Sequence, residues 1–321
     1  MKNLLTGDIG GTKTLLQIET SSGVSQQSYA SAEYASLQDV VSLFLRESGI
    51  TRVDAACFAL AGPVAGRIGK LTNLPWPDVD ADALAAACNI GEVTLINDFA
   101  AVGYGLAALR ADDLVTLQAG NPQPDGVRLA TGPGTGLGVV WLTPQGVHAS
   151  EGGHADFAPV NEVQKELLFH LRNLYGRATY ERIVSGPGLV DVFNFLCGAR
   201  GYSPPPQLRA AMTEGDAAAA ISHFARQDYL AREALDIFIS VYGAFVGDLA
   251  LTLLPRGGIY LAGGISAKIV DELRNGGFLR AFRDKGRFAW LLESFPVHVV
   301  THPTPGLLGA RAVIPAKITR E

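Results

Sequence analysis

The chain has 321 residues, of which 48% are hydrophobic, and it carries a formal net charge of −5 with a pI near 5.7. This length accommodates two domains, each with its own buried core. The acidic balance and the lack of any Lys/Arg cluster exclude a nucleic-acid footprint and favour small-molecule partners.

Cysteine usage and hydropathy favour a cytoplasmic protein. Cys57, Cys88 and Cys197 are odd in number and widely spaced, which predicts three buried, reduced thiols rather than disulfides or a zinc site. The apolar run before Asp8 is too short for the core of a signal peptide. Acidic residues interrupt the longest apolar tracts, so no membrane span is expected.

The first chemical signal is a glycine-rich turn between two apolar runs, within residues 4–18. The segment contains Gly7, Asp8, Ile9, Gly10, Gly11 and Thr12. Glycines permit backbone amides to converge on phosphate oxygens, and Asp8 beside them is suited to hold Mg²⁺ through water. A P-loop is excluded because Thr12 stands where it requires glycine and the following sequence is β-like rather than helical. An ordinary β-hairpin with a roomy turn is the alternative.

The next elements alternate between strands and helices. Strands are predicted at 24–31 and 53–60, and helices at 36–48 and 80–88. Trp76 lies in a proline-stiffened loop, where it either walls a pocket or packs in the core; packing is the expectation.

Asn97 and Asp98 follow a predicted strand at 92–96 and begin a predicted helix at 99–109. A structural interpretation makes one of them a helix N-cap, worth about 1 kcal/mol. A functional interpretation makes Asp98 a general base, because strand ends of doubly wound sheets carry catalytic groups. The residues alone leave both open.

The second half follows a loop at 121–126, where residues 127–142 repeat the strand, glycine/threonine turn, strand plan. The turn contains Gly132, Gly134, Thr135 and Gly136. A dinucleotide fingerprint is excluded because Leu137 or Val139 stands at its last glycine. Two such turns, one per domain, are suited to hold one nucleotide from both sides.

Polar residues come next. His154, close to Glu151, is predicted to form hydrogen bonds rather than to bind metal, since no second His or Cys cluster completes a site. A helix is expected at 161–175. Glu181 is a further carboxylate, just before a turn and a helix. The alternative to a functional role is that Glu181 is a solvated residue at a helix end.

The C-terminal third is predicted to be helical from 213 to 254. A strand at 257–261 then leads to a diglycine turn at Gly263 and Gly264, suited to close approach by adenine. A last strand at 297–301 and a terminal helix at 307–314 complete the chain.

Six motifs, in this order and spacing, resemble bacterial glucokinases between residue 4 and about residue 312. They are residues 7–12, 96–101, 132–138, 151–154, 185–188 and 261–264. The resemblance implies an α/β, actin-like ATPase (ribonuclease H-like) fold with two α/β domains around a cleft. Residues 1–110 plus 302–321 then form the small domain and 111–301 the large one. It also implies a cytoplasmic homodimer without nucleic-acid or membrane partners.

The same resemblance implies ATP-dependent phosphorylation of glucose at the 6-hydroxyl, with Asp98 as catalytic base. The implied sugar-binding residues are Asn97, Asp98, Glu151, His154 and Glu181. The implied nucleotide-binding residues are Gly7, Asp8, Ile9, Gly10, Gly11, Thr12, Gly132, Gly134, Thr135, Gly136, Gly263 and Gly264, with Mg²⁺ at Asp8. The Cys-rich zinc loop of the related repressor and sugar-kinase family is absent from this sequence, which favours the zinc-free branch.

Two alternatives remain open. A kinase for another hexose or an amino sugar has the same side-chain types, because these do not fix hydroxyl stereochemistry. A chaperone- or filament-like ATPase shares both phosphate turns but has no reason to cluster sugar-type carboxylates.

Overall fold

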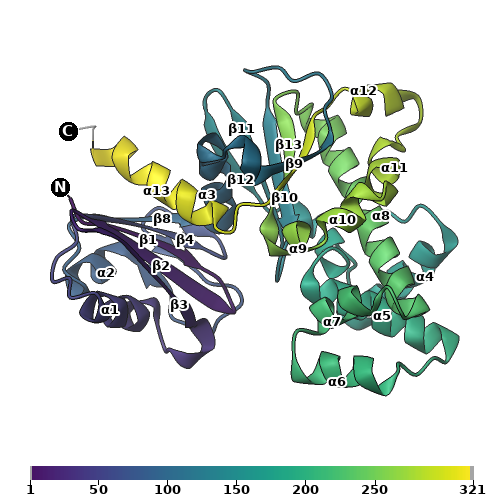
Figure 1. Cartoon of the computed structure of the whole chain (residues 1–321), viewed down its shortest axis with the longest axis horizontal. Coiled ribbons are helices and arrows are strands. Elements are labelled where there is room, and N and C mark those ends of the chain that lie inside the picture. The colour runs from purple at the N-terminus through teal and green to yellow at the C-terminus, as the bar shows by residue number, and fades with distance from the viewer. Residues whose placement is uncertain (1, 319–321) are drawn as a thin grey trace. The chain divides into compact units, whose positions relative to one another are not determined.

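A computed structural model describes residues 2–318, and the chain divides into two compact units (Figure 1). Unit 1 comprises Met1–Ala111, Val147–Ala149 and His302–Glu321, and unit 2 comprises Asp112–Gly146 and Ser150–Thr301. The division expected from the sequence differs from these units at Ala111 and at Val147–Ala149, which are grouped with unit 1.

Unit 1 is built on a five-stranded sheet in the order β3-β2-β1-β4-β8. The strands are β1 (Leu4–Ile9), β2 (Lys13–Thr20), β3 (Gly23–Ala30), β4 (Ala55–Leu60) and β8 (Val93–Asn97). The first three form an antiparallel meander, whereas β1, β4 and β8 run parallel. In register, Ile9 pairs with Leu60 and Leu60 with Asn97, so these three strands end at the same edge of the sheet.

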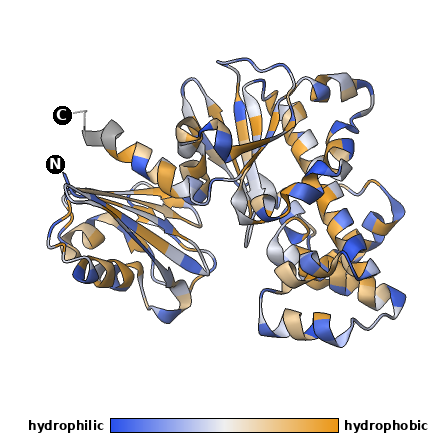
Figure 2. Cartoon of the chain, in the orientation of Figure 1, coloured by the Kyte–Doolittle hydropathy of each residue, from blue (hydrophilic) through white to orange (hydrophobic). Residues whose placement is uncertain are grey.

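Helices cover both faces of this sheet. They include α1 (Leu37–Glu47), α2 (Ala81–Ala87), α3 (Asp98–Gly105) and α13 (Pro305–Ile318), and a small second sheet holds β5 (Val64–Ala65), β6 (Ile68–Gly69) and β7 (Val79–Asp80). Successive residues of β4 alternate between faces. Phe58 packs in the core that contains α1 and α2, whereas Cys57 packs against α13. The outward side of α1 is hydrophilic (Figure 2).

The helices α3 and α13 approach so closely that glycine is required between them. A Cβ atom on Gly309 of α13 would lie 1.7 Å from the carbonyl oxygen of Ala101 in α3. Because that obstacle is backbone, Gly309→Ala is expected to destabilise unit 1 by about 3 kcal/mol or more. Calorimetric melting checks this. Gly198→Ala is the matched control: that helical glycine has no atom within 4 Å of its would-be Cβ, so the change should stabilise by about 0.5–1 kcal/mol. Equal melting temperatures of the two variants would contradict the close packing.

Unit 2 repeats the plan around a six-stranded sheet in the order β12-β11-β10-β13-β14-β9. The strands are β9 (Leu114–Gln118), β10 (Arg128–Pro133), β11 (Leu137–Thr143), β12 (Gly146–Ser150), β13 (Gly258–Leu261) and β14 (Val297–Val300). The antiparallel hairpin of β10 and β11 adjoins the parallel strands β13 and β14. Each unit therefore combines a glycine-turn hairpin with parallel strands.

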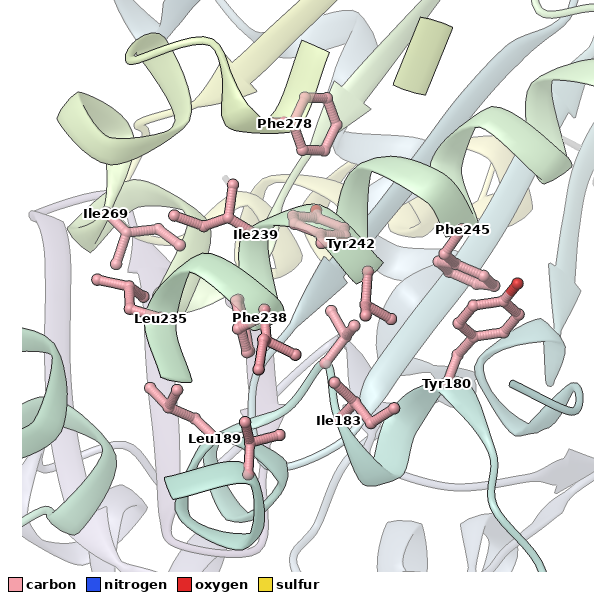
Figure 3. Packing of buried hydrophobic residues seen from close by; sticks show 14 of the residues in the cluster. Tyr180, Ile183, Leu189, Leu235, Phe238, Ile239, Tyr242, Phe245, Ile269 and Phe278 are labelled. Atoms are coloured by element: carbon pink, nitrogen blue, oxygen red, sulfur yellow. The ribbon is translucent and has the colours of Figure 1, made fainter. Parts of the chain in front are cut away.

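The helices of unit 2 surround one central helix. They include α4 (Glu162–Tyr175), α5 (Gly186–Arg200), α6 (Pro206–Glu214), α7 (Ala217–Phe224), α8 (Tyr229–Leu253), α9 (Gly263–Lys268), α10 (Val270–Arg274), α11 (Gly277–Arg283) and α12 (Ala289–Glu293). Phe238, Tyr242 and Phe245 of α8 are fully enclosed, with Phe278 of α11 against Tyr242 (Figure 3). Among residues 2–318, α8 alone is long and apolar enough to cross a membrane, but most of its apolar window is buried in this core.

The region predicted to be helical, 213–254, is helical but is not a single helix. It is divided into the end of α6, α7 and α8. Asp216 accepts a hydrogen bond from the amide of Ala219, and Asp228 accepts one from the amide of Ala231, so each begins a new helix as its N-cap.

Other sequence-based expectations are corrected too. Gly263 and Gly264 are the first residues of α9, and Gly263 has a positive φ of 81° with its would-be Cβ 2.6 Å from the carbonyl oxygen of Pro133, so glycine is required where the chain leaves β13. Cys197 is partly exposed, whereas Cys57 and Cys88 are buried. Trp76 packs as expected: it is 7% exposed and donates to the carbonyl oxygen of Tyr34 at 2.7 Å.

Candidate active site

The carboxyl edge of the unit 1 sheet carries two acidic residues. Asp8 is the penultimate residue of β1, and Asp98 directly follows β8. The turn Gly10–Thr12 leaves the same edge, closed by a hydrogen bond from the Gly10 amide to the Lys13 carbonyl at 2.9 Å. The edge therefore combines two carboxylates with a glycine turn whose Thr12 is exposed.

Asn97 is the N-cap of α3. Its Oδ1 accepts hydrogen bonds from the amides of Phe99 and Ala100 at 3.0 and 3.1 Å, and its Nδ2 donates to the carbonyl of Gly62 at 3.2 Å. Asp98 is the first helical residue, and its Oδ1 accepts from the Phe99 amide at 2.9 Å. Asn97 is therefore the helix cap. Asp98 is not the cap, and the first amide of the helix orients its carboxylate.

Asp8 lies close to a glycine at the start of α13. A Cβ on Gly306, just inside α13, would lie 3.0 Å from Oδ2 of Asp8. Burial raises the pKa of Asp8 to about 6, and Lys13 opposes this shift by its positive charge. A desolvated carboxylate at the end of a strand, beside a glycine turn, fits a hard divalent cation such as Mg²⁺, which prefers oxygen ligands. Gly306 was not predicted as a site residue from the sequence. Its position at the end of a Pro-Thr-Pro-Gly turn is the sequence feature that could have indicated it.

The raised pKa of Asp8 makes stability depend on pH. Its folded-state pKa of about 6 exceeds the ordinary 3.8, so its proton contributes stability that is fully present below about pH 3.8 and lost as pH rises through 6. Asp8→Asn should therefore gain up to about 3 kcal/mol over the wild type at pH 8 and nothing at pH 3.5. Urea unfolding at both pH values without Mg²⁺ measures this, with exposed Asp78→Asn as the control. An equal gain at both pH values would contradict the assignment.

Gly7 has a packing role in the same strand. It is buried within β1, and a Cβ there would lie 2.6 Å from Cδ1 of Phe58. Ile9 is likewise buried in the core. Of the predicted nucleotide-binding residues in unit 1, Gly10, Gly11 and Thr12 form the turn itself.

Unit 2 gathers a histidine and two glutamates. Nε2 of His154 lies 3.9 Å from Oε2 of Glu151, and its Nδ1 lies 3.7 Å from Oε1 of Glu181. Oε2 of Glu181 accepts a hydrogen bond from the Leu137 amide at 2.8 Å. Glu151 and His154 are mostly exposed, so the cluster presents hydrogen-bonding groups at the surface of unit 2.

The glycine turn of unit 2 lies against this cluster. A Cβ on Gly136 would lie 2.6 Å from Oε2 of Glu181, so only glycine lets the carboxylate reach the Leu137 amide. The turn is also tied to the start of α5, because the Gly186 amide donates to the Gly134 carbonyl at 2.9 Å. Ser185 donates to the carbonyl of Glu181 at 2.7 Å and caps α5 through the Gly188 amide. The turn and Glu181 are therefore positioned by one connected set of bonds.

The third glycine segment joins the same turn. A Cβ on Gly132 would lie 1.9 Å from the carbonyl oxygen of Ala262, so β10 and the start of α9 are in direct backbone contact. Gly134 and Gly264 have open space where a side chain would lie, and Thr135 is exposed. These glycines give unit 2 an uncovered backbone surface at the ends of β10 and β13.

Comparison with known proteins assigns the family. The sequence model of the glucokinase family matches residues 5–317. A protein of Nostoc punctiforme named glucokinase is 44% identical over 335 residues, covering 97% of this chain and 98% of that protein. The chain belongs to the glucokinase family. This is a family of enzymes, and the match covers nearly the whole sequence.

Solved structures agree in fold. The glucokinase of an Antarctic psychrotroph has a TM-score of 0.80 at 29% identity, covering 98% of this chain and 99% of that one. A ROK-family glucokinase from Streptomyces griseus, solved with glucose and AMPPNP, has a TM-score of 0.67 at 22% identity, covering 97% and 98%. The glucokinase resemblance and the actin-like α/β fold expected from the sequence are confirmed.

Proposed function

We propose that this enzyme transfers the γ-phosphoryl group of ATP to the 6-hydroxyl of glucose, giving glucose 6-phosphate and ADP. The observation that carries the proposal is the cluster of Glu151, His154 and Glu181, in a chain of the glucokinase family. Each sugar hydroxyl both donates and accepts, and carboxylates flanking an imidazole supply acceptors and a donor at one place.

In the proposed reaction Asp98 is the general base. It accepts the proton of the 6-hydroxyl as that oxygen attacks the γ-phosphorus, and the bond from this phosphorus to the bridging oxygen of ADP breaks. The start of α3 supports this role, because the Phe99 amide fixes the orientation of the Asp98 carboxylate at 2.9 Å. Asn97 sets the start of that helix and, in this proposal, offers its amide to the sugar as well.

The two glycine turns are assigned to the phosphates of ATP. Gly10, Gly11 and Thr12 in unit 1 and Gly134, Thr135 and Gly136 in unit 2 present main-chain amides, with Gly263 and Gly264 beside the second turn for the adenosine. Asp8 would hold Mg²⁺, which when bound neutralises negative charge on the phosphates. Lys13 lies close enough to Asp8 to lower its pKa and adds positive charge to this edge.

The proposal extends to the setting of the enzyme. We assign unit 1 to the small domain and unit 2 to the large domain of the family, with the boundaries given above. We further propose a cytoplasmic homodimer without nucleic-acid or membrane partners, which suits the acidic charge of −5. Sedimentation of the purified protein at several concentrations tests the dimer.

A coupled assay over a panel of sugars and phosphoryl donors tests the reaction. Glucose with ATP and Mg²⁺ should give the highest kcat/KM, and mannose, glucosamine and polyphosphate much lower values. A higher kcat/KM for another hexose or for an amino sugar would make this a kinase for that sugar. ATP hydrolysis that no sugar stimulates would instead favour the non-kinase ATPase alternative.

A further inference from the structure

Unit 2 contains a cavity of about 890 Å³ that none of the assigned site residues lines. It is bounded by α8, α10 and α11 and by the segment that follows α11. The charged side chains that line it are Arg232, Asp236, Glu272, Arg280, Asp284 and Lys285. Its volume lies within the range of small-molecule sites, about 300–1,000 Å³.

Some charged side chains of this cavity form ion pairs with one another and others do not. Arg232 binds Glu272 through Nη1 at 2.8 Å and Asp236 through Nη2 at 2.6 Å, and its buried Nε has no hydrogen-bond partner among the described residues. Within residues 2–318 no ion pair engages Arg280 or Asp284. One cation and one carboxylate therefore face the cavity without a charged protein partner, which is suited to a ligand with an anionic group and hydroxyls.

Lys285 connects the cavity to the sugar-binding cluster. Its Nζ donates to Oδ1 of Asp248 at 2.5 Å and to the carbonyl of Ala244 at 3.1 Å. Oδ2 of the same carboxylate accepts from the hydroxyl of Tyr180 at 2.9 Å. Tyr180 is 5% exposed and directly precedes Glu181 in the same short 3-10 helix, Tyr180–Arg182.

The ring of Tyr180 is held by the core. Its centroid lies 4.6 Å from that of Phe245, whose helix also carries Ile239 on the cavity wall (Figure 3). Burial and the neighbouring Asp248 carboxylate raise the pKa of Tyr180, so the phenol stays protonated and donates at neutral pH. The chain of contacts thus runs from Lys285 through Asp248 to Tyr180.

We propose that this cavity binds a small phosphomonoester bearing hydroxyl groups and that its occupancy weakens glucose binding through Lys285, Asp248 and Tyr180. The phosphate takes hydrogen bonds from Arg280 and Lys285, and the hydroxyls donate to Asp284 and Asp236. A phosphate on Lys285 competes with Asp248 for the ammonium group. The Asp248–Tyr180 bond then loses its support, and the positioning of Glu181 loosens. This coupling rests on the proposed sugar-binding role of Glu181, whereas the binding itself does not.

Calorimetry with glycerol 3-phosphate on the full-length protein tests the binding, since this probe has a phosphate and hydroxyls but no sugar ring. The wild type should bind with a Kd below about 1 mM. Arg280→Ala should weaken binding at least about 10-fold, because a charge-assisted hydrogen bond is lost. Arg274→Ala, an exposed arginine of α10 outside the cavity, should bind as the wild type does. No binding, or equal binding by Arg280→Ala, would overturn the site.

Kinetics test the coupling. Saturating glycerol 3-phosphate should raise the KM for glucose about 3-fold or more with kcat little changed. By linkage, glucose should weaken glycerol 3-phosphate binding by the factor by which the probe raises the Kd for glucose. Tyr180→Phe keeps the ring but removes the donor, so it should bind the probe normally and lose the KM response. A KM response retained in Tyr180→Phe would overturn the route. Binding of the probe without any KM response in the wild type would overturn the coupling and leave the proposed sugar kinase activity unaffected.

Discussion

Asp98→Asn is expected to lower kcat about 10²–10⁴-fold, because asparagine cannot accept the proton of the attacking hydroxyl. Asparagine retains an oxygen that accepts from the Phe99 amide, so α3 should begin as before. Steady-state kinetics with glucose and ATP, together with glucose binding by calorimetry, measure the effect. The melting temperature and the Kd for glucose should stay close to those of the wild type.

The matched control for this change is Asp125→Asn in the exposed loop before β10. It alters charge equally and should leave kcat unchanged. Turnover of Asp98→Asn within about 10-fold of the wild type would remove Asp98 from the role of base. A base elsewhere at the carboxyl edge of the unit 1 sheet would then have to be sought.

Glu181→Ala is expected to raise the KM for glucose about 10–100-fold, the loss that follows removal of one or two charge-assisted hydrogen bonds. Kinetics across glucose concentrations measure the effect. The same change leaves the amide of Leu137 without its acceptor at 2.8 Å, so the melting temperature should also fall. Glu181→Gln separates the two effects, because its amide oxygen still accepts from Leu137. Its stability should be nearly normal while its KM remains raised.

Glu214→Ala serves as the control, since that residue ends α6 and is exposed. Its KM should equal that of the wild type. If Glu181→Ala and Glu181→Gln both bind glucose normally, Glu181 is a structural acceptor for the glycine turn alone. The assignment of the cluster to the sugar would then fail.

Elements whose signal is local were predicted well from the sequence. The helix expected at 36–48 is α1, begun by Ser36, whose Oγ accepts from the Asp39 amide at 3.2 Å. The strand expected at 53–60 and the hairpins at both glycine turns are also present. Caps, turns and alternating or continuous apolar runs depend on neighbours within a few residues, so the sequence displays them directly.

The edge strands β9 and β12 were not predicted, because they have no such local signal in the sequence. Gly146–Ser150 has no apolar run, and its residues are partly or fully exposed. Leu114–Gln118 becomes a strand by pairing with Val297–Val300, about 180 residues later in the chain. Strands of this kind depend on a partner that is distant in sequence, which periodicity does not reveal.

The sequence by itself determined the family, the order of the glycine turns and the residue types of the candidate site, because the spacing of motifs is a property of the sequence alone. Only the tertiary structure decided which groups meet. The Glu181 carboxylate reaches the Leu137 amide from 44 residues away, His154 lies between two glutamates, and Gly306 lies against the carboxylate of Asp8. The cavity of unit 2 is a tertiary feature too, since α8, α10 and α11 bring its charges together. Side-chain chemistry is a local property, but burial, pKa and contact distances depend on the packing of segments that are far apart in the chain.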